Sequence, residues 1–237
     1  MAKAPTPRPA PAGPRPRVRE LPLAILLAVV AVGLLFLGAG TLRWPAGWGF
    51  VAATGAGFVL HRAHVARRNP DLFARRDAAG AGGAAWDRVW LAAFWPLMLS
   101  VPTTAGLEVR LGGRPLEPWL WPAGALVFGL GLALSAAAMA VNPSFEGTAR
   151  VQRELGQQVV EAGPYRRMRH PGYAGLALWA LSMPLLLLSR WALAPAALAA
   201  AWVVLRTALE DRMLRRELAG YAEYARRVRW RLLPGVW

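Results

Sequence analysis

The sequence contains no cysteine, a single lysine and only three histidines among its 237 residues. Without a thiol the chain can form no disulfide, thiolate metal site, iron–sulfur cluster or cysteine nucleophile. Charged residues make up only 17% of the chain, with 13 Asp and Glu against 28 Lys and Arg, while hydrophobic residues reach 56%. Soluble domains average about 25% charged and about 45–50% apolar residues. The composition therefore excludes a disordered protein and indicates an integral membrane protein.

Long apolar runs account for most of the chain. A membrane-spanning helix needs about 20 predominantly apolar residues, and the runs of suitable length are 21–42, 44 to about 60, 89–107 and 119–141. The last apolar stretch, 173–205, is too long for one span, and Ser189-Arg190 interrupts it. A single long helix would carry Arg190 into the lipid, which is costly, so we predict a tight hairpin of helices at about 173–189 and 191–209. The expected fold is all-α, a polytopic transmembrane bundle of five or six spans without a Rossmann domain.

The basic residues indicate how this bundle is oriented. Of the 28 Lys and Arg, 24 lie in the N-terminal tail, in loops 61–88 and 142–172, and from residue 206 onward. Cytoplasmic loops carry such an excess, so we predict that both termini and these loops are cytoplasmic. The net charge of +15 then fits this topology and anionic membrane lipid, and nucleic acid is not needed as a partner. The Arg-, Ala-, Gly- and Pro-rich sequence resembles that of a high-GC bacterium, which predicts the inner membrane.

We divide the chain into three parts. Residues 1–20 are rich in proline and arginine and predict a flexible cytoplasmic arm. Residues 21–141 are expected to form four transmembrane helices with the cytoplasmic loop 61–88. Residues 142–237 are expected to contain a cytoplasmic loop, the helical hairpin and a cytoplasmic tail. Because the outer loops are short, an active site is expected at the cytoplasmic face.

The segment 161–175 has the densest set of polar and aromatic side chains. Gly163-Pro164 and His170-Pro171 each predict a non-helical turn. A helix is expected to open near Tyr173, and its free backbone N–H groups would suit a carboxylate or phosphate ligand. The alternative is a basic, lipid-facing loop that anchors the helix.

A second cluster lies where the last span would leave the membrane. Arg206 and Glu210 are four residues apart and share a helix face. They form an interfacial ion pair, or else Arg206 holds an anion while Glu210 or Asp211 binds a cation or hydroxyl groups. Both alternatives are compatible with the sequence.

Other polar residues are weaker candidates. Asn142-Pro143 closes the fourth apolar run, either as a helix cap or with its amide pointing into a cavity. His61 and His64 supply at most half of a metal site, and we expect no metal. The Gly and Ala faces of the fourth run are expected to serve close helix packing.

The C-terminal third combines short motifs in a fixed order. They are Gly163-Pro164-Tyr165, Arg169-His170-Pro171-x-Tyr173-x-Gly175, Arg206 with Glu210-Asp211-x-x-Leu214, Gly220-Tyr221-x-x-Tyr224 and Arg231-Leu-Leu-Pro234. At these spacings residues 142–237 resemble the isoprenylcysteine carboxyl methyltransferase family and the related phospholipid methyltransferases. Asn69-Pro70-x-Leu72 and Trp86-Asp87-Arg88 extend the resemblance more weakly upstream. The family's usual acidic pair is Glu-Glu, and here it is Glu210-Asp211.

The resemblance implies S-adenosylmethionine as the methyl donor, bound at the cytoplasmic face, and a lipid-like substrate that enters between the helices. We expect the cofactor pocket to be lined by Gly163, Pro164, Tyr165, Arg169, His170, Pro171, Tyr173, Glu210 and Asp211. Arg206 is expected beside the methyl acceptor, with Asn142 as a second substrate-binding residue. Arg206 and Glu210 are the expected catalytic residues, Arg206 to orient a carboxylate and Glu210 as a base for an amine.

These observations predict an integral membrane methyltransferase that uses S-adenosylmethionine and acts on the carboxylate of a lipid-like or lipidated acceptor. Phospholipid N-methylation is the first alternative, since the same residues serve either chemistry. A non-catalytic membrane protein that binds anionic lipid through its arginines is the alternative of another class. His170, Tyr173, Arg206 and Glu210 argue against this last alternative because the motif is intact.

Overall fold

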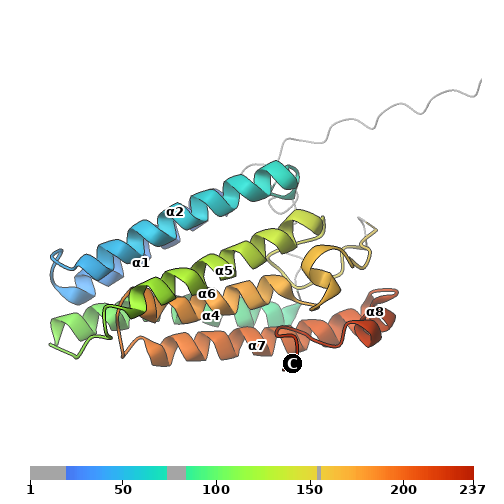
Figure 1. Cartoon of the computed structure of the whole chain (residues 1–237). Coiled ribbons are helices and arrows are strands. Elements are labelled where there is room, and N and C mark those ends of the chain that lie inside the picture. Colours follow the sequence, from blue (N-terminus) through green and yellow to red (C-terminus); the bar gives the residue numbers. More distant parts are fainter. Residues whose placement is uncertain (1–19, 74–83, 154–155) are drawn as a thin grey trace, which may run out of the picture.

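The computed structural model describes residues 20–73, 84–153 and 156–237, which form a bundle of six long helices (Figure 1). The helices are α1 (Glu20–Ala39), α2 (Pro45–Arg68), α4 (Ala85–Arg110), α5 (Leu120–Val141), α6 (Pro171–Leu186) and α7 (Leu193–Glu217). The short helices η2 (Gly163–Arg166) and α8 (Tyr221–Arg227) lie at one end, called the site end below. The described ranges contain no strand, so the all-α prediction without a Rossmann domain is confirmed. The predicted arm 1–20, except Glu20, and residues 74–83 of the predicted loop lie outside the described residues.

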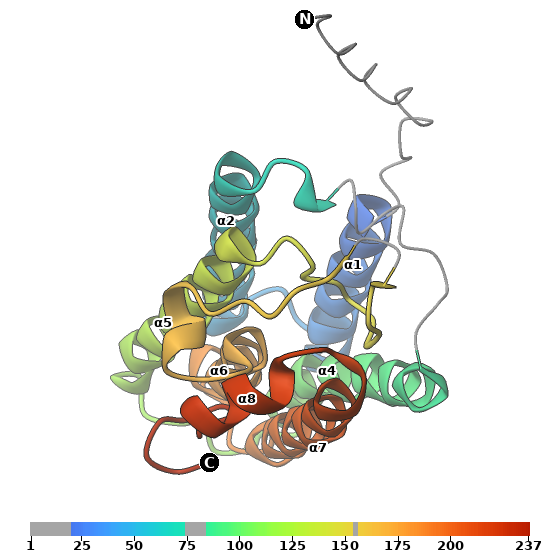
Figure 2. The ribbon, with the colours of Figure 1, turned by 90° about the vertical axis from the view of Figure 1, so that its right-hand side faces the viewer.

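Helix α6 lies between α5 and α4 and next to α7 when the bundle is viewed from the site end (Figure 2). It packs most extensively against α5 and also contacts α7 and α4, while α1 packs on α4 and α2 packs on α5. Buried residues from α4, α6 and α7, among them Phe94, Ala180 and Val203, form one continuous core. The core fixes where α6 and α7 present their polar ends.

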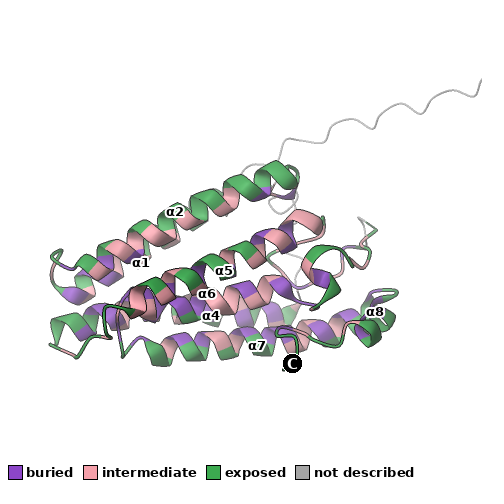
Figure 3. Ribbon diagram, in the orientation of Figure 1, coloured by how far each residue is buried: buried purple, intermediate pink, exposed green. Residues whose placement is uncertain are grey.

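Apolar helices of spanning length make this a multi-pass membrane bundle. Four of the described helices, α1, α4, α5 and α7, are long and apolar enough to cross a membrane, whereas α6 is a shorter apolar helix. Many positions along α2 are exposed (Figure 3), and the first half of α1 is almost entirely exposed, with side chains that include Leu23, Ile25 and Leu26. Such a surface suits lipid rather than water. The prediction of five or six spans depends on whether α2 and α6 also cross, and it stays a prediction.

Two helices extend beyond the apolar runs that predicted them. Helix α4 covers Ala85–Arg110 rather than 89–107, and it buries Asp87 and Glu108, which the sequence had placed in loops. Helix α7 continues to Glu217, past the predicted end at residue 209. These boundaries were wrong because an apolar run marks only the lipid-facing length of a helix. Charged residues prolong a helix when another element supplies their partners.

The end of the bundle opposite the site carries the predicted hairpin turn. Helix α6 ends at Leu186 and Leu188 adopts a left-handed backbone conformation with φ of 51°, so Ser189 and Arg190 lie in the turn before α7. Glu108 of α4 is buried at 3% exposure and accepts hydrogen bonds from the Ser189 hydroxyl at 2.5 Å and the Trp191 N–H at 3.1 Å. One carboxylate of α4 therefore fixes the turn that joins α6 to α7.

Glycines set the close approach of α5 and α6. A Cβ atom on Gly131 would lie 2.8 Å from the Gly175 carbonyl oxygen, and one on Gly175 would lie 2.5 Å from the Gly131 carbonyl oxygen. Real Cβ atoms do not approach backbone so closely, so neither position tolerates a side chain without separating the helices. The expected packing role of the small residues in α5 is thus confirmed, and it follows the rule for helices in membranes.

Replacing Gly131 by valine should push α5 away from α6 and lower the free energy of unfolding by about 1–3 kcal/mol, as overpacking does. The matched control is Gly129→Val, because Gly129 lies on the same helix and a Cβ atom there would have no neighbouring atom within 4 Å. Thermal unfolding in detergent measures both variants. Equal unfolding temperatures for the two would show that the α5–α6 contact does not depend on glycine.

Candidate functional site

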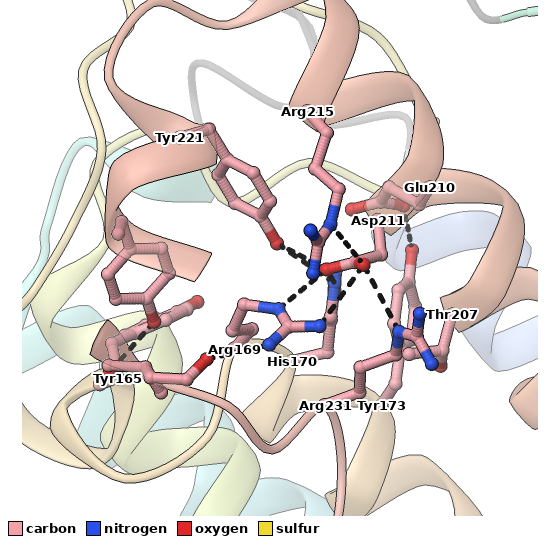
Figure 4. Close-up of polar contacts among 12 residues, drawn as sticks. Tyr165, Arg169, His170, Tyr173, Thr207, Glu210, Asp211, Arg215, Tyr221 and Arg231 are labelled. Carbon is pink, nitrogen blue, oxygen red and sulfur yellow. Dashed lines mark hydrogen bonds and ion pairs between the residues drawn. The ribbon is translucent and has the colours of Figure 1, made fainter. Parts of the chain in front are cut away.

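The predicted site residues lie together at the site end of the bundle, although they come from distant parts of the sequence (Figure 4). They are supplied by the loop before α6, by the first turn of α6 and by the last turns of α7. The motifs that the sequence analysis singled out therefore do form one three-dimensional cluster. Within it the side chains form two groups, one around Asp211 and one around Arg206.

Asp211 of α7 is the centre of the first group and is 1% exposed. Its Oδ1 accepts a hydrogen bond from Arg169 Nε at 2.7 Å, and its Oδ2 accepts one from Arg169 Nη2 at 3.1 Å. Arg215 Nε and Arg231 Nε contact the same Oδ2 at 3.0 Å and 3.1 Å. The Tyr221 hydroxyl donates to Oδ1 at 3.1 Å. One carboxylate thus joins the loop before α6 to α7, α8 and the C-terminal segment 228–237.

Arg169 directs most of its donors to the protein itself. Besides Asp211, its Nη1 group donates to the carbonyl oxygens of Val228 at 2.6 Å and Arg229 at 2.8 Å. Its backbone N–H donates to the Trp230 carbonyl oxygen at 2.9 Å. This guanidinium therefore clamps the C-terminal segment over the start of α6. Arg169 was predicted to line the cofactor pocket, and an anionic group of the cofactor would have to compete with these bonds for it.

His170 lies between the two groups. Its Nε2 atom is 3.1 Å from the Tyr221 hydroxyl and 3.4 Å from Asp211 Oδ1. Its ring stacks on Tyr173, with centroids 5.8 Å apart and an interplanar angle of 18°. Burial raises the pKa of Tyr221, and the nearby Asp211 carboxylate raises it further, so this phenol keeps its proton and can donate to Asp211. The histidine ring is thereby held in one orientation with one face on Tyr173.

Helix α6 begins at Pro171, two residues before the predicted start near Tyr173, and Gly172 lies in its first turn. A Cβ atom on Gly172 would lie 2.5 Å from the ring of Phe145, so this ring packs directly on the glycine backbone. His170 N–H, just before the helix, donates to the Arg231 carbonyl oxygen at 2.9 Å. Phe145 and the C-terminal segment therefore cover the helix start where an anionic ligand was expected.

The sequence predicted a non-helical turn at Gly163-Pro164, whereas these residues begin a short 3-10 helix. Gly163 adopts a φ of +56°, which favours glycine, and Pro164 follows in the first turn. The Tyr165 hydroxyl accepts a hydrogen bond from Asn142 Nδ2 at 2.9 Å, and the Tyr165 carbonyl oxygen accepts one from the Tyr224 hydroxyl at 2.7 Å. Burial raises the pKa of Tyr165, so its phenol remains neutral and supports the turn.

Asn142 occupies the C-cap of α5. Its side-chain oxygen accepts a hydrogen bond from the Ser144 N–H at 2.9 Å. Together with the bond to Tyr165, this engages both ends of the amide inside the loop. The geometry corresponds to the cap alternative of the sequence analysis, and the substrate-binding role of Asn142 stays a prediction.

The second group is built around Arg206 of α7, which is 3% exposed. Its Nη2 group pairs with Asp87 Oδ1 at 2.8 Å and donates to the Gly147 carbonyl oxygen at 2.8 Å. Its guanidinium carbon lies 4.3 Å from the centroid of the Trp90 ring and 5.3 Å from that of Tyr173. The Nε atom of Arg206 is buried and has no hydrogen-bond partner in the described part of the chain.

Glu210 belongs to this second group through Tyr173 and not through Arg206. The Tyr173 hydroxyl donates to Glu210 Oε2 at 2.5 Å. The helical spacing had suggested an ion pair between Arg206 and Glu210, but Arg206 pairs with Asp87 instead. Spacing along one helix predicted a shared face, and it could not reveal an acid on another helix. The other carboxylate oxygen of Glu210 has no protein partner in the described part of the chain, which leaves it available to a ligand.

Asp87 is the main residue that the sequence reasoning missed. It appeared there only as part of Trp86-Asp87-Arg88, a short motif next to an apolar run. Asp87 could have been found as an acidic residue that directly precedes a long apolar run. An acidic residue at such a place is buried only when it has a partner, so a partner could have been sought. No group of three His, Asp or Glu side chains suited to a metal ion occurs in the three described ranges.

Comparisons with known proteins agree with this geometry. Residues 125–216 match the model of the isoprenylcysteine carboxyl methyltransferase (ICMT) family. Among solved structures, the chain is similar to the eukaryotic intramembrane Ras methyltransferase ICMT, solved without a monobody. The TM-score is 0.54 at 19% identity, over 90% of this chain and 75% of that one. Compared by sequence with curated proteins, the chain has no significant match.

At this identity the structural similarity establishes the fold, and the family match establishes the sequence pattern from α5 to the end of α7. Both comparisons include α6 and α7, which carry Arg169, His170, Tyr173, Arg206 and Glu210 or lie directly beside them. The resemblance predicted from the C-terminal motifs is therefore confirmed: the chain has the membrane fold of the isoprenylcysteine carboxyl methyltransferases, and residues 125–216 carry the sequence pattern of that family.

Proposed function

We propose that this protein is a membrane methyltransferase that uses S-adenosylmethionine to methylate the carboxylate of a lipid-like or lipidated acceptor. The observation that carries the proposal is the environment of Arg206. A buried guanidinium with an unpartnered Nε–H is costly unless a ligand supplies the acceptor. A carboxylate matches this donor, and the family match makes a methyl acceptor the ligand to expect.

The residues at the site end fit S-adenosylmethionine, which supplies an electrophilic methyl group when bound. Glu210 keeps one carboxylate oxygen for the ammonium or the ribose hydroxyls, while Tyr173 fixes the other. His170, Tyr173 and the Gly163–Tyr165 turn remain the proposed lining of the cofactor pocket, and Pro171 begins the helix that holds them. We assign Arg169 and Asp211 to the wall of this pocket, because they bind each other and the C-terminal segment.

The chain's own contribution to catalysis is orientation and exclusion of water. Arg206 would hold one oxygen of the acceptor carboxylate and leave the other to attack. An ionised carboxylate needs no general base, so Glu210 is not required to take a proton in this reaction. The rings of Trp90 and Tyr173 lie against the guanidinium. They exclude water from a step in which opposite charges are neutralised.

Phospholipid N-methylation is the second candidate, and the Tyr173–Glu210 pair favours it. An amine must lose a proton before it attacks, and Glu210 lies in the site as a base. A purely lipid-binding role fits less well, because Arg206 is buried among protein groups instead of facing lipid headgroups. The excess of Lys and Arg at this end supports a cytoplasmic site in a bacterial inner membrane, with anionic lipid nearby.

Replacing Glu210 by glutamine should weaken binding of S-adenosylmethionine by about tenfold, because it removes a charge-assisted bond to the cofactor. Calorimetric titration of the detergent-purified protein measures the dissociation constant. Glu217→Gln is the matched control, since Glu217 is an exposed residue near the end of the same helix. An unchanged affinity for the Glu210 variant would remove this residue from the cofactor pocket.

Replacing Arg206 by alanine should reduce methyl transfer by about 100-fold, the size of effect seen when one oriented donor is removed from an active site. The affinity for S-adenosylmethionine should stay within about threefold, because Arg206 is assigned to the acceptor. Transfer of a labelled methyl group and titration of the cofactor provide the two readouts. Loss of cofactor binding would instead place Arg206 in the cofactor pocket.

Replacing Asp211 by asparagine should act mainly on stability, because three guanidinium groups share its carboxylate. Breaking a buried ion-pair network costs about 3–5 kcal/mol, so we expect a lower unfolding temperature in detergent. Below that temperature the variant should bind S-adenosylmethionine within about threefold of the unmodified protein. A stable variant that no longer binds the cofactor would return Asp211 to the cofactor-binding residues.

A further inference from the structure

Asp87, in the first turn of α4, is fully buried although it lies outside every apolar run. Its two carboxylate oxygens have different partners. Oδ1 pairs with Arg206 Nη2 at 2.8 Å, and Oδ2 accepts a hydrogen bond from the Ala149 N–H at 2.8 Å. The side chain therefore connects α4 to α7 and to the loop before α6 at one point.

The loop is held at the same place by a second set of bonds. The Ala84 N–H, just before α4, donates to the Ala149 carbonyl oxygen at 3.1 Å. Two residues earlier, the Gly147 carbonyl oxygen accepts a hydrogen bond from Arg206 Nη2 at 2.8 Å. Asp87, Arg206 and the segment 147–149 thus form a closed set in which each member contacts the other two.

The plane of the guanidinium is fixed by Trp90, one turn after Asp87. Arg206 lies over the Trp90 ring at 4.3 Å. Trp90 is itself immobilised against α7, because its Nε1–H donates to the Trp202 carbonyl oxygen at 2.8 Å and the Trp202 Nε1–H donates to the Trp90 carbonyl oxygen at 3.2 Å. This reciprocal pair fixes the position of α4 relative to α7 one turn before Arg206.

We propose that Asp87 is the positioning residue for Arg206, and that it determines how the acceptor carboxylate is held; this inference rests on the proposed function. An arginine without other partners can bind a carboxylate through two parallel N–H···O hydrogen bonds, a bidentate fork. Both forks of a guanidinium, Nε with Nη2 and Nη1 with Nη2, use the Nη2 group, and here Nη2 already contacts two protein oxygens. The acceptor therefore meets no fork, and the donor assigned to it is the buried Nε–H, which has no partner in the described part of the chain. Asp87 also balances the charge of Arg206. The acceptor is then oriented by a hydrogen bond and keeps more of its nucleophilic charge than it would in a full ion pair.

The competing explanation is that Asp87 only stabilises the packing of α4 on α7. The two explanations differ in a double-mutant cycle. If Asp87 acts through Arg206, its loss should matter only while Arg206 is present. If it acts through packing, its loss should lower activity equally in both backgrounds.

The experiment uses the full chain in detergent or liposomes. It follows the transfer of a labelled methyl group from S-adenosylmethionine to N-acetyl-S-farnesylcysteine. This probe is an isoprenylcysteine, the class of acceptor after which the matching family is named. Asp87→Asn, Arg206→Ala and the double variant are compared. We expect Asp87→Asn to lower kcat/KM for the acceptor by about tenfold, and to change it by less than about twofold in the Arg206→Ala background. The dissociation constant for S-adenosylmethionine should change by less than about twofold. Asp71→Asn is the matched control, since Asp71 is exposed.

Two results would overturn the positioning role alone: equal losses in both backgrounds, or an Asp87→Asn variant as active as the unmodified protein. If Asp87→Asn does not fold because Arg206 is left buried without a counter-charge, Asp87→Glu replaces it. That variant keeps the charge, moves it by one methylene group and should show the same loss of kcat/KM, and full activity would overturn the role. The unmodified protein could also fail to transfer a methyl group to the probe and to every component of a lipid extract. That result would overturn the proposed function and the positioning role of Asp87 together.

Discussion

The arrangement of the site end depends on the shared carboxylate of Asp211. Three arginines, one tyrosine and one histidine converge on it from the loop before α6, from α7 and α8, and from the C-terminal segment. Removing a carboxylate from water is costly, and the cost is offset only when several donors surround it. The short helix α8 also packs in a small apolar cluster that includes Leu218, Tyr221 and Tyr224. The polar centre and this cluster together fix the short elements at the site end, as the apolar core fixes the six long helices.

The Asp211 group and the Arg206 group meet at the stacked rings of His170 and Tyr173. This contact explains why one short motif at the start of α6 contributes to both. Arg169 and His170 face the Asp211 side, while Tyr173 reaches Glu210 and lies near Arg206. The wall of the site and its reactive side are thereby fixed relative to each other by residues only four positions apart. Buried polar networks that are connected in this way favour a single arrangement, and the Nε–H of Arg206 is the donor that this network leaves unpartnered in the described part of the chain.

Much of this architecture could be predicted from the sequence, because lipid imposes strong constraints on length and hydrophobicity. The apolar runs predicted the long helices, and the interruption at Ser189-Arg190 predicted the hairpin. The motifs also predicted which residues gather at one end. The partners of Arg206 could not be predicted, because Asp87 and Gly147 are distant in sequence and only the packing of α4 on α7 brings them together. The same holds for Glu108, whose burial depends on a turn some 80 residues away.

The bond between Glu108 and the turn at Ser189 has a mechanical consequence. The α6–α7 hairpin is tethered at the end far from the site, by a carboxylate on a third helix. Near the other end, Asp87 and Trp90 of the same helix α4 hold Arg206 and Trp202 of α7. The hairpin is therefore attached to α4 close to both of its ends, and a rocking motion of α7 against α4 would have to break one of these attachments.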